Sequence, residues 1–137
     1  SSYGLVIGVA AVILLDTHVV VWLYTDPKAY IPAAVARRLN SEQLGLPPFV
    51  RLELTYLHEI GRIAVSGQEI LDELCPKLEI ALTDPPAALV CQVANQFSWT
   101  RDPFDRLIAA QAIATATPLL TKDLTIRKNL DLAWWGD

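Results

Sequence analysis

Short apolar runs, separated by longer helix-like segments, are the feature that most constrains how this chain can fold. The runs cover residues 12–15, 78–82, 118–121 and 132–135. Runs of this length and character are typical of strands that are buried on both faces of a sheet, since a core helix needs at least ten residues or so. The segments between the runs carry helix signals. This alternation predicts an α/β sandwich with a central, mostly parallel sheet.

Proline, glycine and capping residues set the expected bounds of the helices. Helices are expected to begin where Asp, Ser or Pro can occupy the first turn, and to end at Gly or Pro. Pro76 is expected to end one helix, and residues 45–48 are expected to be a break between two others. The expected helices are 17–24, 32–43, 49–62, 66–76, 85–97, 103–115 and 125–128.

The composition fits one globular domain with a sizeable core. The chain has 137 residues, of which 53% are hydrophobic and 19% charged, and its net charge is −4. A chain of this length buries roughly 70% of its unfolded surface, so it needs no disulfides. The acidic balance excludes binding of nucleic acid through a basic coat, but not through a local patch or a metal ion. Cys75 and Cys91 lack the paired spacing of a zinc site and are expected to be reduced thiols.

The N-terminal part is apolar for about the length of a membrane span. Residues 5–24 are almost wholly apolar, but Asp16 and His18 fall near the middle, where charge is costly in a bilayer. No Lys or Arg precedes Lys28, which argues against a signal peptide. We therefore expect residues 1–11 to be an extension or an expression remnant, and residues 12–137 to form a single cytoplasmic domain with no membrane contact.

Four acidic residues fall at the ends of predicted strands or the beginnings of predicted helices. Asp16 directly follows the first apolar run, and Asp123 follows the run 118–121. Asp102 and Asp105 lie in the first turn of the helix that Pro103 opens. Each of these residues on its own fits a helix N-cap, because an Asp oxygen accepts hydrogen bonds from the free amides of a first turn. In a parallel sheet, however, the carboxyl ends of the strands share one edge, where ligands bind.

A fifth acid is predicted to lie on a buried helix face. The neighbours of Glu53 three and four positions away are all apolar, and so is Ile60 one turn further on. A buried carboxylate is costly unless it is paired, protonated or bound to a metal ion. These apolar neighbours are Phe49, Val50, Tyr56 and Leu57.

Together, Asp16, Glu53, Asp105 and Asp123 predict a cation site. Four carboxylates at one edge do not stay ionised without a cation between them. Oxygen ligands without His or Cys favour Mg²⁺ or Mn²⁺ over zinc. An acidic cage of this kind holds a metal ion against a phosphodiester in nucleases.

The sequence resembles the PIN-domain ribonuclease toxins of the VapC type, the nuclease half of bacterial toxin–antitoxin pairs. Four stretches carry the resemblance: VILLDTH at 12–18, RLEL at 51–54 with GRI at 61–63, RDPFDRLIAAQA at 101–112, and LLTKD at 119–123. The third stretch is the most specific, and the order and spacing of all four agree with the family. Val50 departs from the family, in which Ser or Thr is common three positions before the second acid.

The resemblance implies a PIN-like three-layer α/β/α sandwich and an endoribonuclease that depends on Mg²⁺ or Mn²⁺. It implies an RNA substrate, a homodimer and a cognate VapB-like antitoxin that covers the acidic site. The family's catalytic and metal-binding acids correspond to Asp16, Glu53, Asp105 and Asp123. Further candidates are Asp102, Thr17 and Thr121.

Two other functions remain open at this stage: a receiver-like phosphate-accepting domain, and a PIN-like interaction module without catalysis. Labelling with a small phosphodonor tests the receiver-like function, and metal-dependent RNA cleavage distinguishes a nuclease from the interaction module. His18 is expected to be an ordinary histidine near the surface, and Trp22 to belong to the core or to a dimer interface. Basic residues close to the acids in sequence are either ordinary surface charges or guides for RNA; they are Arg101, Arg106, Lys122, Arg127 and Lys128.

Overall fold

A parallel sheet forms the centre of the computed structural model, which describes residues 11–136. Within these residues the sheet has five strands in the order β3-β2-β1-β4-β5. The strands are β1 (Val12–Leu15), β2 (Gln43–Leu46), β3 (Ile80–Leu82), β4 (Leu119–Leu120) and β5 (Ala133–Trp134). Strand β1 lies in the middle and pairs with β2 and β4 in parallel. Its run of apolar residues fits this position, because a central strand is covered on both faces.

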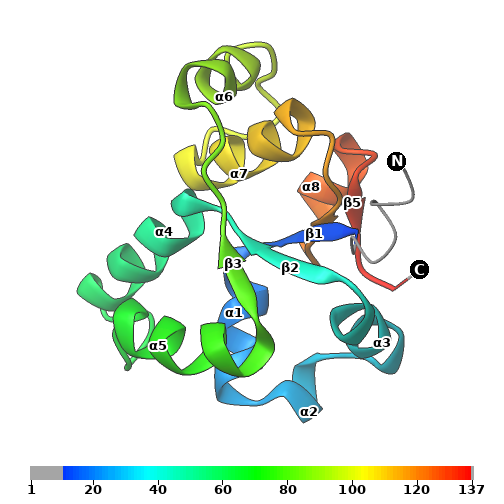
Figure 1. Ribbon diagram of the computed structural model, residues 1–137. Helices are drawn as coiled ribbons and strands as arrows, with labels where there is room; N and C mark the ends of the chain where they lie inside the picture. Colours follow the sequence, from blue (N-terminus) through cyan, green and yellow to red (C-terminus); the bar gives the residue numbers. More distant parts are fainter. Residues whose placement is uncertain (1–10, 137) are drawn as a thin grey trace, which may run out of the picture.

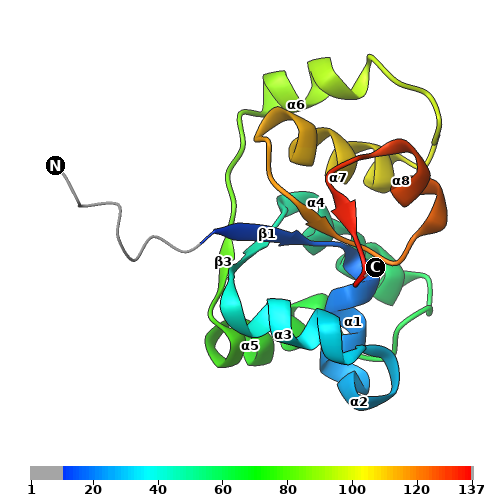
Figure 2. The same cartoon turned by 90° about the vertical axis from the view of Figure 1, so that its right-hand side faces the viewer.

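Helices cover both faces of the sheet, which confirms the predicted three-layer sandwich. Figures 1 and 2 show α6, α7 and α8 on one side of the sheet and α1, α2, α3 and α5 on the other. Helix α4 contacts α1, α5 and α7, and so joins the two layers. The helices are α1 (Thr17–Thr25), α2 (Pro27–Tyr30), α3 (Ala33–Ser41), α4 (Pro48–Glu59), α5 (Gly67–Leu78), α6 (Ala87–Ala94), α7 (Pro103–Ala114) and α8 (Leu124–Asn129).

Strand β2 is the main error of the sequence prediction, which extended the preceding helix to Gln43 and treated residues 45–48 as a break. The helix ends at Ser41, and Gly45 lies inside β2. A Cβ atom at Gly45 would lie 3.1 Å from both Leu14 Cδ2 and Thr83 Cγ2. Glycine is therefore present because neighbouring side chains pack closely over β2, and not because the chain turns there.

Several helix bounds also differ from expectation: α4 ends at Glu59 rather than at residue 62, and α6 ends at Ala94 rather than at residue 97. Pro76 lies inside α5, which continues to Leu78 and is closed by Glu79 in the left-handed region at φ 54°. The proline falls in the last turn, so its missing amide hydrogen bond affects only the end of the helix. The short helix α2 was not predicted; Asp26 caps it by accepting a hydrogen bond from the Ala29 amide.

The strand order excludes the receiver-like alternative. Receiver domains have the order 2-1-3-4-5, whereas the order here is 3-2-1-4-5. Within residues 11–136, none of the helices has the length and apolar character that crossing a bilayer requires. The expectation of an N-terminal extension concerns residues 1–11, of which 1–10 lie outside the described part of the chain.

Candidate metal centre

Asp16 lies at the carboxyl end of β1, where it also caps α1. Its Oδ1 accepts a hydrogen bond from the Thr17 amide at 2.8 Å, and its Oδ2 accepts one from the Thr121 hydroxyl at 2.6 Å. The residue is only 2% exposed. Asp16 can therefore be both the N-cap of α1 and a residue of the candidate site, because the cap fixes the direction in which the buried carboxylate points.

Thr121 connects two of the predicted acids. Its hydroxyl donates to Asp16 and accepts a hydrogen bond from the Asp123 amide at 3.1 Å. The pairing of Leu15 with Leu120 sets the ends of β1 and β4 side by side and so makes this contact possible. The Asp123 carboxylate caps α8 by accepting from the Ile126 amide at 2.9 Å.

Glu53 extends from α4 toward Asp16. Its Oε1 accepts a hydrogen bond from the Thr17 hydroxyl. Burial raises the pKa of Glu53; the Thr17 hydrogen bond opposes this shift, and the charges of Asp16 and Asp102 add to it. The family position that is Val50 here is buried in the core, and Thr17 supplies the hydroxyl that contacts Glu53.

The prediction that Glu53 lies on a fully buried helix face is wrong in detail. Val50 and Leu54 are the buried residues of α4, whereas Tyr56 and Ile60 are about half exposed. Glu53 is half-buried beside that face. The contacts of α4 with α1 and α7 leave this flank facing the site, which helical periodicity alone does not reveal.

Asp105 occupies the first turn of α7 but does not cap it. The cap is Asp102, whose Oδ1 accepts from the Asp105 amide at 3.0 Å. Burial raises the pKa of Asp105 to about 7, and the charges of Asp16, Asp102, Glu53 and Asp123 contribute to the shift. Ionisation of the half-buried Asp105 carboxylate is therefore opposed first by its burial and then by the negative charge of its neighbours.

Asp16, Glu53 and Asp105 line one cavity of about 370 Å³. Its lining residues come from the end of β1, from α1, α4 and α7, and from the turn after α4; Figure 1 shows where these helices lie. Asp102 and Asp123 are not among its lining residues, although their charges raise the pKa of Asp105. The structure thus brings three of the four predicted acids to one space. The other lining residues are Thr17, His18, Val21, Trp22, Leu57, Arg62 and Ile63.

His18 is a residue of this site that the sequence analysis misjudged. Its side chain is 29% exposed; Nε2 accepts a hydrogen bond from the Lys122 amide at 3.0 Å, and Nδ1 lies 3.5 Å from Asp16 Oδ2. Burial lowers the pKa of His18, opposed mainly by the charge of Asp16. Its position two residues after the first acid was the available signal, since the first turn of α1 begins at the sheet edge.

Arg62 also lines the acidic cavity, and no role was predicted for it. Helix α4 ends at Glu59, and Gly61 follows in the left-handed region at φ 78°. This turn directs the chain back, and the Arg62 amide donates to the Leu57 carbonyl at 2.8 Å. A glycine just after a helix end is a common reversal signal, but it does not reveal which residues then face a site.

The chemistry of the donor set fits a hard divalent cation. The three acids in the cavity offer only carboxylate oxygens, and burial together with neighbouring carboxylates raises the pKa of Asp105, so a bound cation would favour its ionised form. Among residues 11–136, no group of three His, Cys, Asp or Glu side chains already converges as a complete ligand set. Mg²⁺ does not require one, because it keeps several water ligands and binds proteins through one or two carboxylates.

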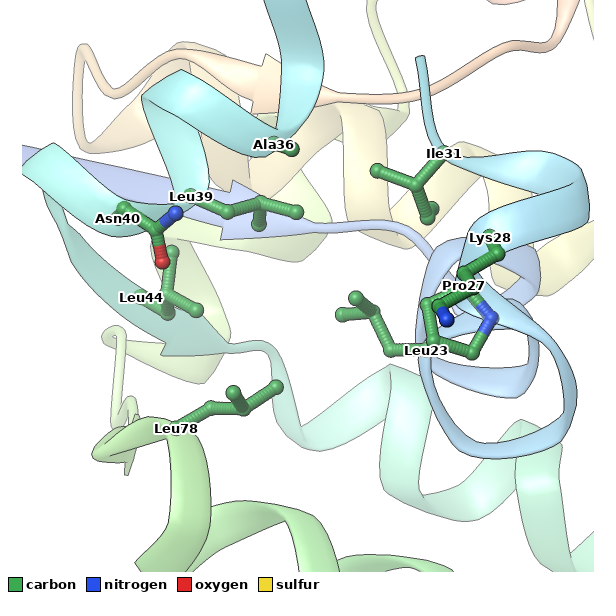
Figure 3. Close-up of a pocket in the computed structure, with 9 residues that line it drawn as sticks. All are labelled: Leu23, Pro27, Lys28, Ile31, Ala36, Leu39, Asn40, Leu44 and Leu78. Atoms are coloured by element: carbon green, nitrogen blue, oxygen red, sulfur yellow. The ribbon is translucent and has the colours of Figure 1, made fainter. Parts of the chain in front are cut away.

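A second, apolar cavity contains none of these acids. It measures about 300 Å³, and Figure 3 shows side chains from α1, α2, α3, β2 and α5 around it. Without an acid or a nucleophile it offers no hydrolytic chemistry. Its lining residues are Leu23, Pro27, Lys28, Ile31, Ala36, Leu39, Asn40, Leu44 and Leu78.

Comparisons with known proteins agree with the fold and with the sequence resemblance. Residues 13–129 match the PIN domain family. Ribonuclease VapC22 of Mycobacterium tuberculosis is 32% identical over 119 residues, which are 85% of this chain and 91% of that protein.

Two solved structures share the fold at low identity. VapBC-1 from nontypeable Haemophilus influenzae has a TM-score of 0.66 and 15% identity, and covers 92% of this chain and 97% of its own. VapBC2 from Rickettsia felis, bound to a DNA fragment from its promoter, has a TM-score of 0.63 and 18% identity. The match covers 90% of this chain and 98% of that one. The chain therefore belongs to the PIN domain family, and within that family it is of the VapC type.

Proposed function

We propose that this protein is an endoribonuclease that depends on Mg²⁺ or Mn²⁺ and acts in the cytoplasm as the toxin of a type II toxin–antitoxin pair. The observation that carries the proposal is that Asp16, Glu53 and Asp105 line one cavity, in which burial and neighbouring charges raise the pKa of Asp105 to about 7. RNA is the proposed substrate because the relative that is 32% identical is a ribonuclease.

Each acid has a proposed role in hydrolysis of the phosphodiester. A bound Mg²⁺ or Mn²⁺ supplies neutralisation of the phosphate charge and a water molecule of lowered pKa. Asp16 and Asp105 would hold the cation, and Glu53 and Asp123 would support it directly or through water. Because its pKa is raised, Glu53 is suited to accept the proton of the attacking water.

The two hydroxyl residues and the fifth acid position these groups. Thr17 orients Glu53, and Thr121 orients both Asp16 and the backbone before Asp123. Asp102 fixes the first turn of α7 and so the position of Asp105.

The proposed partners are a VapB-like antitoxin and a second copy of the chain. The solved relatives named above are VapBC complexes. An antitoxin that inhibits by covering the site is expected to place an Arg among Asp16, Glu53 and Asp105, because the guanidinium fork binds carboxylates bidentately. Co-purification from the native operon tests this: a soluble complex with suppressed cleavage supports it, and recovery of the toxin alone contradicts it.

Cleavage of RNA across a titration of Mg²⁺ and Mn²⁺ tests the activity. The wild-type chain is expected to cut RNA only with the metal present. Asp16→Asn and Asp105→Asn are each expected to lower the rate by at least ~100-fold, since each removes one charge from the proposed cation site. Asp131→Asn, an exposed residue before β5, is the matched control and keeps the wild-type rate. Absence of cleavage by the wild-type chain with either metal would favour the non-catalytic interaction module instead.

A further inference from the structure

A further pocket, distinct from the apolar cavity of Figure 3, adjoins the acidic cavity. It measures about 320 Å³ and is lined by His18, Trp22, Lys122, Asp123 and Leu124. His18 and Trp22 also line the acidic cavity, so these two side chains form a wall shared by both spaces. The two spaces are therefore neighbours, separated by no more than the side chains of His18 and Trp22.

The shared wall is held in place before anything binds. The His18 ring lies 4.8 Å from the ring of Trp22, measured between centroids, and its Nε2 accepts a hydrogen bond from the Lys122 amide. The Trp22 ring stacks on Tyr30 at 5.3 Å with the planes 12° apart, and meets Trp135 edge-on at 5.8 Å. Side chains that are already ordered lose little entropy when a ligand packs against them.

The other lining residues of the pocket include an exposed apolar side chain and a cation. Leu124 opens α8 and is 69% exposed, the highest fraction among the large hydrophobic residues in the described part of the chain. The Lys122 ammonium lies 5.7 Å from the centre of the Trp22 ring. An apolar and aromatic surface beside an ammonium group matches a nucleotide, whose base packs on flat apolar groups and whose phosphate attracts cations.

We propose that this pocket, formed by Trp22, His18, Lys122 and Leu124, is a nucleobase subsite. It receives the base of the nucleotide next to the phosphodiester held at Asp16 and Asp105, while Lys122 contacts a neighbouring phosphate of the same strand. The proposal rests on the proposed ribonuclease function and adds to it a place where the RNA strand is bound through a base.

The pocket suits a base better than a second copy of the chain. A stable interface buries about 800 Å² on each partner with an apolar centre. Here the pocket has a single exposed leucine, and two of its other lining residues, Lys122 and Asp123, are charged. The space is also at the small end of the range of ligand pockets, which run from about 300 to 1,000 Å³.

Binding of a base-bearing and a base-free strand tests the subsite. The probes are a short single-stranded oligouridine and the matching ribose-phosphate strand with abasic positions, each labelled for fluorescence anisotropy. All proteins carry Asp105→Asn, so that the RNA stays intact. Leu124→Ala removes an exposed side chain with little effect on folding, and Leu82→Ala, at 59% exposure on β3, is its matched control.

The background protein is expected to bind the base-bearing strand about 5- to 100-fold more tightly than the abasic one. Leu124→Ala is expected to lose most of this preference, and Leu82→Ala to keep it. Equal affinity for the two strands overturns the subsite, and so does a preference that survives Leu124→Ala. A dimer that dissociates when Leu124→Ala is introduced also overturns it, because the pocket is then an interface between copies. Metal-dependent cleavage by the wild-type chain is measured separately, so loss of the subsite and loss of the nuclease function give different results.

Discussion

Replacing Asp105 by Asn is expected to stabilise the metal-free protein at neutral and higher pH. Burial and four neighbouring carboxylates raise the pKa of Asp105 from 3.8 to about 7. The folded state therefore binds a proton more tightly than the unfolded chain. Between about pH 4 and pH 7 the folded protein carries the extra proton, so stability falls as the pH rises through this window.

The size of this effect follows from the shift. Three pKa units correspond to about 4 kcal/mol, but the carboxyl is only half-buried and solvent screens it, so we expect ~1–2 kcal/mol. Because Asn removes the charge and keeps the shape, Asp105→Asn should melt about 3–6 °C higher than wild type near pH 8 in EDTA. Near pH 4 the two proteins should melt together.

Melting curves from about pH 4 to pH 8, with a chelator and then with Mg²⁺, measure this directly. Added Mg²⁺ should raise the melting temperature of the wild type more than that of the variant, since a ligand that binds only the folded state stabilises it. Asp131→Asn is the control and should not change the pH dependence. A variant that is less stable than wild type near pH 8 in EDTA would refute the charge argument at Asp105.

Three further outcomes are expected. Thr121→Val should destabilise the protein by about 1–3 kcal/mol in urea unfolding, because it removes the hydroxyl shared by Asp16 and the Asp123 amide, and it should also slow RNA cleavage. Gly67→Ala should cost about 1–3 kcal/mol, because the new Cβ would lie 2.9 Å from Leu54 Cβ; an unchanged urea midpoint would contradict the close packing of α5 on α4. Isothermal titration of Mg²⁺ into the antitoxin-free protein should show binding that weakens as the pH falls below about 7, because protons compete for the Asp105 carboxylate.

The parts of the fold with local signals could be predicted from the sequence. The run from Val12 to Leu15 is a continuous apolar segment that stops at a capping Asp. In the structure the run forms β1, and Asp16 caps α1. Strand β2 has no comparable signal, since Gly45 lowers strand propensity. Its glycine makes sense only once Leu14 and Thr83 lie on either side of it, and that is a long-range contact.

In the candidate site, too, residues with local sequence signals could be predicted, whereas residues placed by long-range contacts could not. Asp16 and Asp105 were found because strand ends and first helical turns are local features. The places of His18 and Arg62 were not, because they depend on a hydrogen bond to Lys122 and on the turn at Gly61. Sequence proximity to an acid gave a hint for His18, but no local rule states which side of α1 faces the cavity.

The acids of this site divide into those that cap helices and those that do not. Asp16, Asp102 and Asp123 each accept a hydrogen bond from an amide in the first turn of α1, α7 or α8, where the helix dipole also favours negative charge. Glu53, by contrast, receives one hydrogen bond from a hydroxyl, that of Thr17, and Asp105 is not the cap of its helix. Burial raises the pKa of both Glu53 and Asp105, and neighbouring carboxylates add to the shift. The first turns of α1, α7 and α8 thus stabilise three of the carboxylates, and we expect ionised Asp105, which shares its cavity with Arg62, to favour binding of a further positive charge, whether a divalent cation or an Arg of the proposed antitoxin.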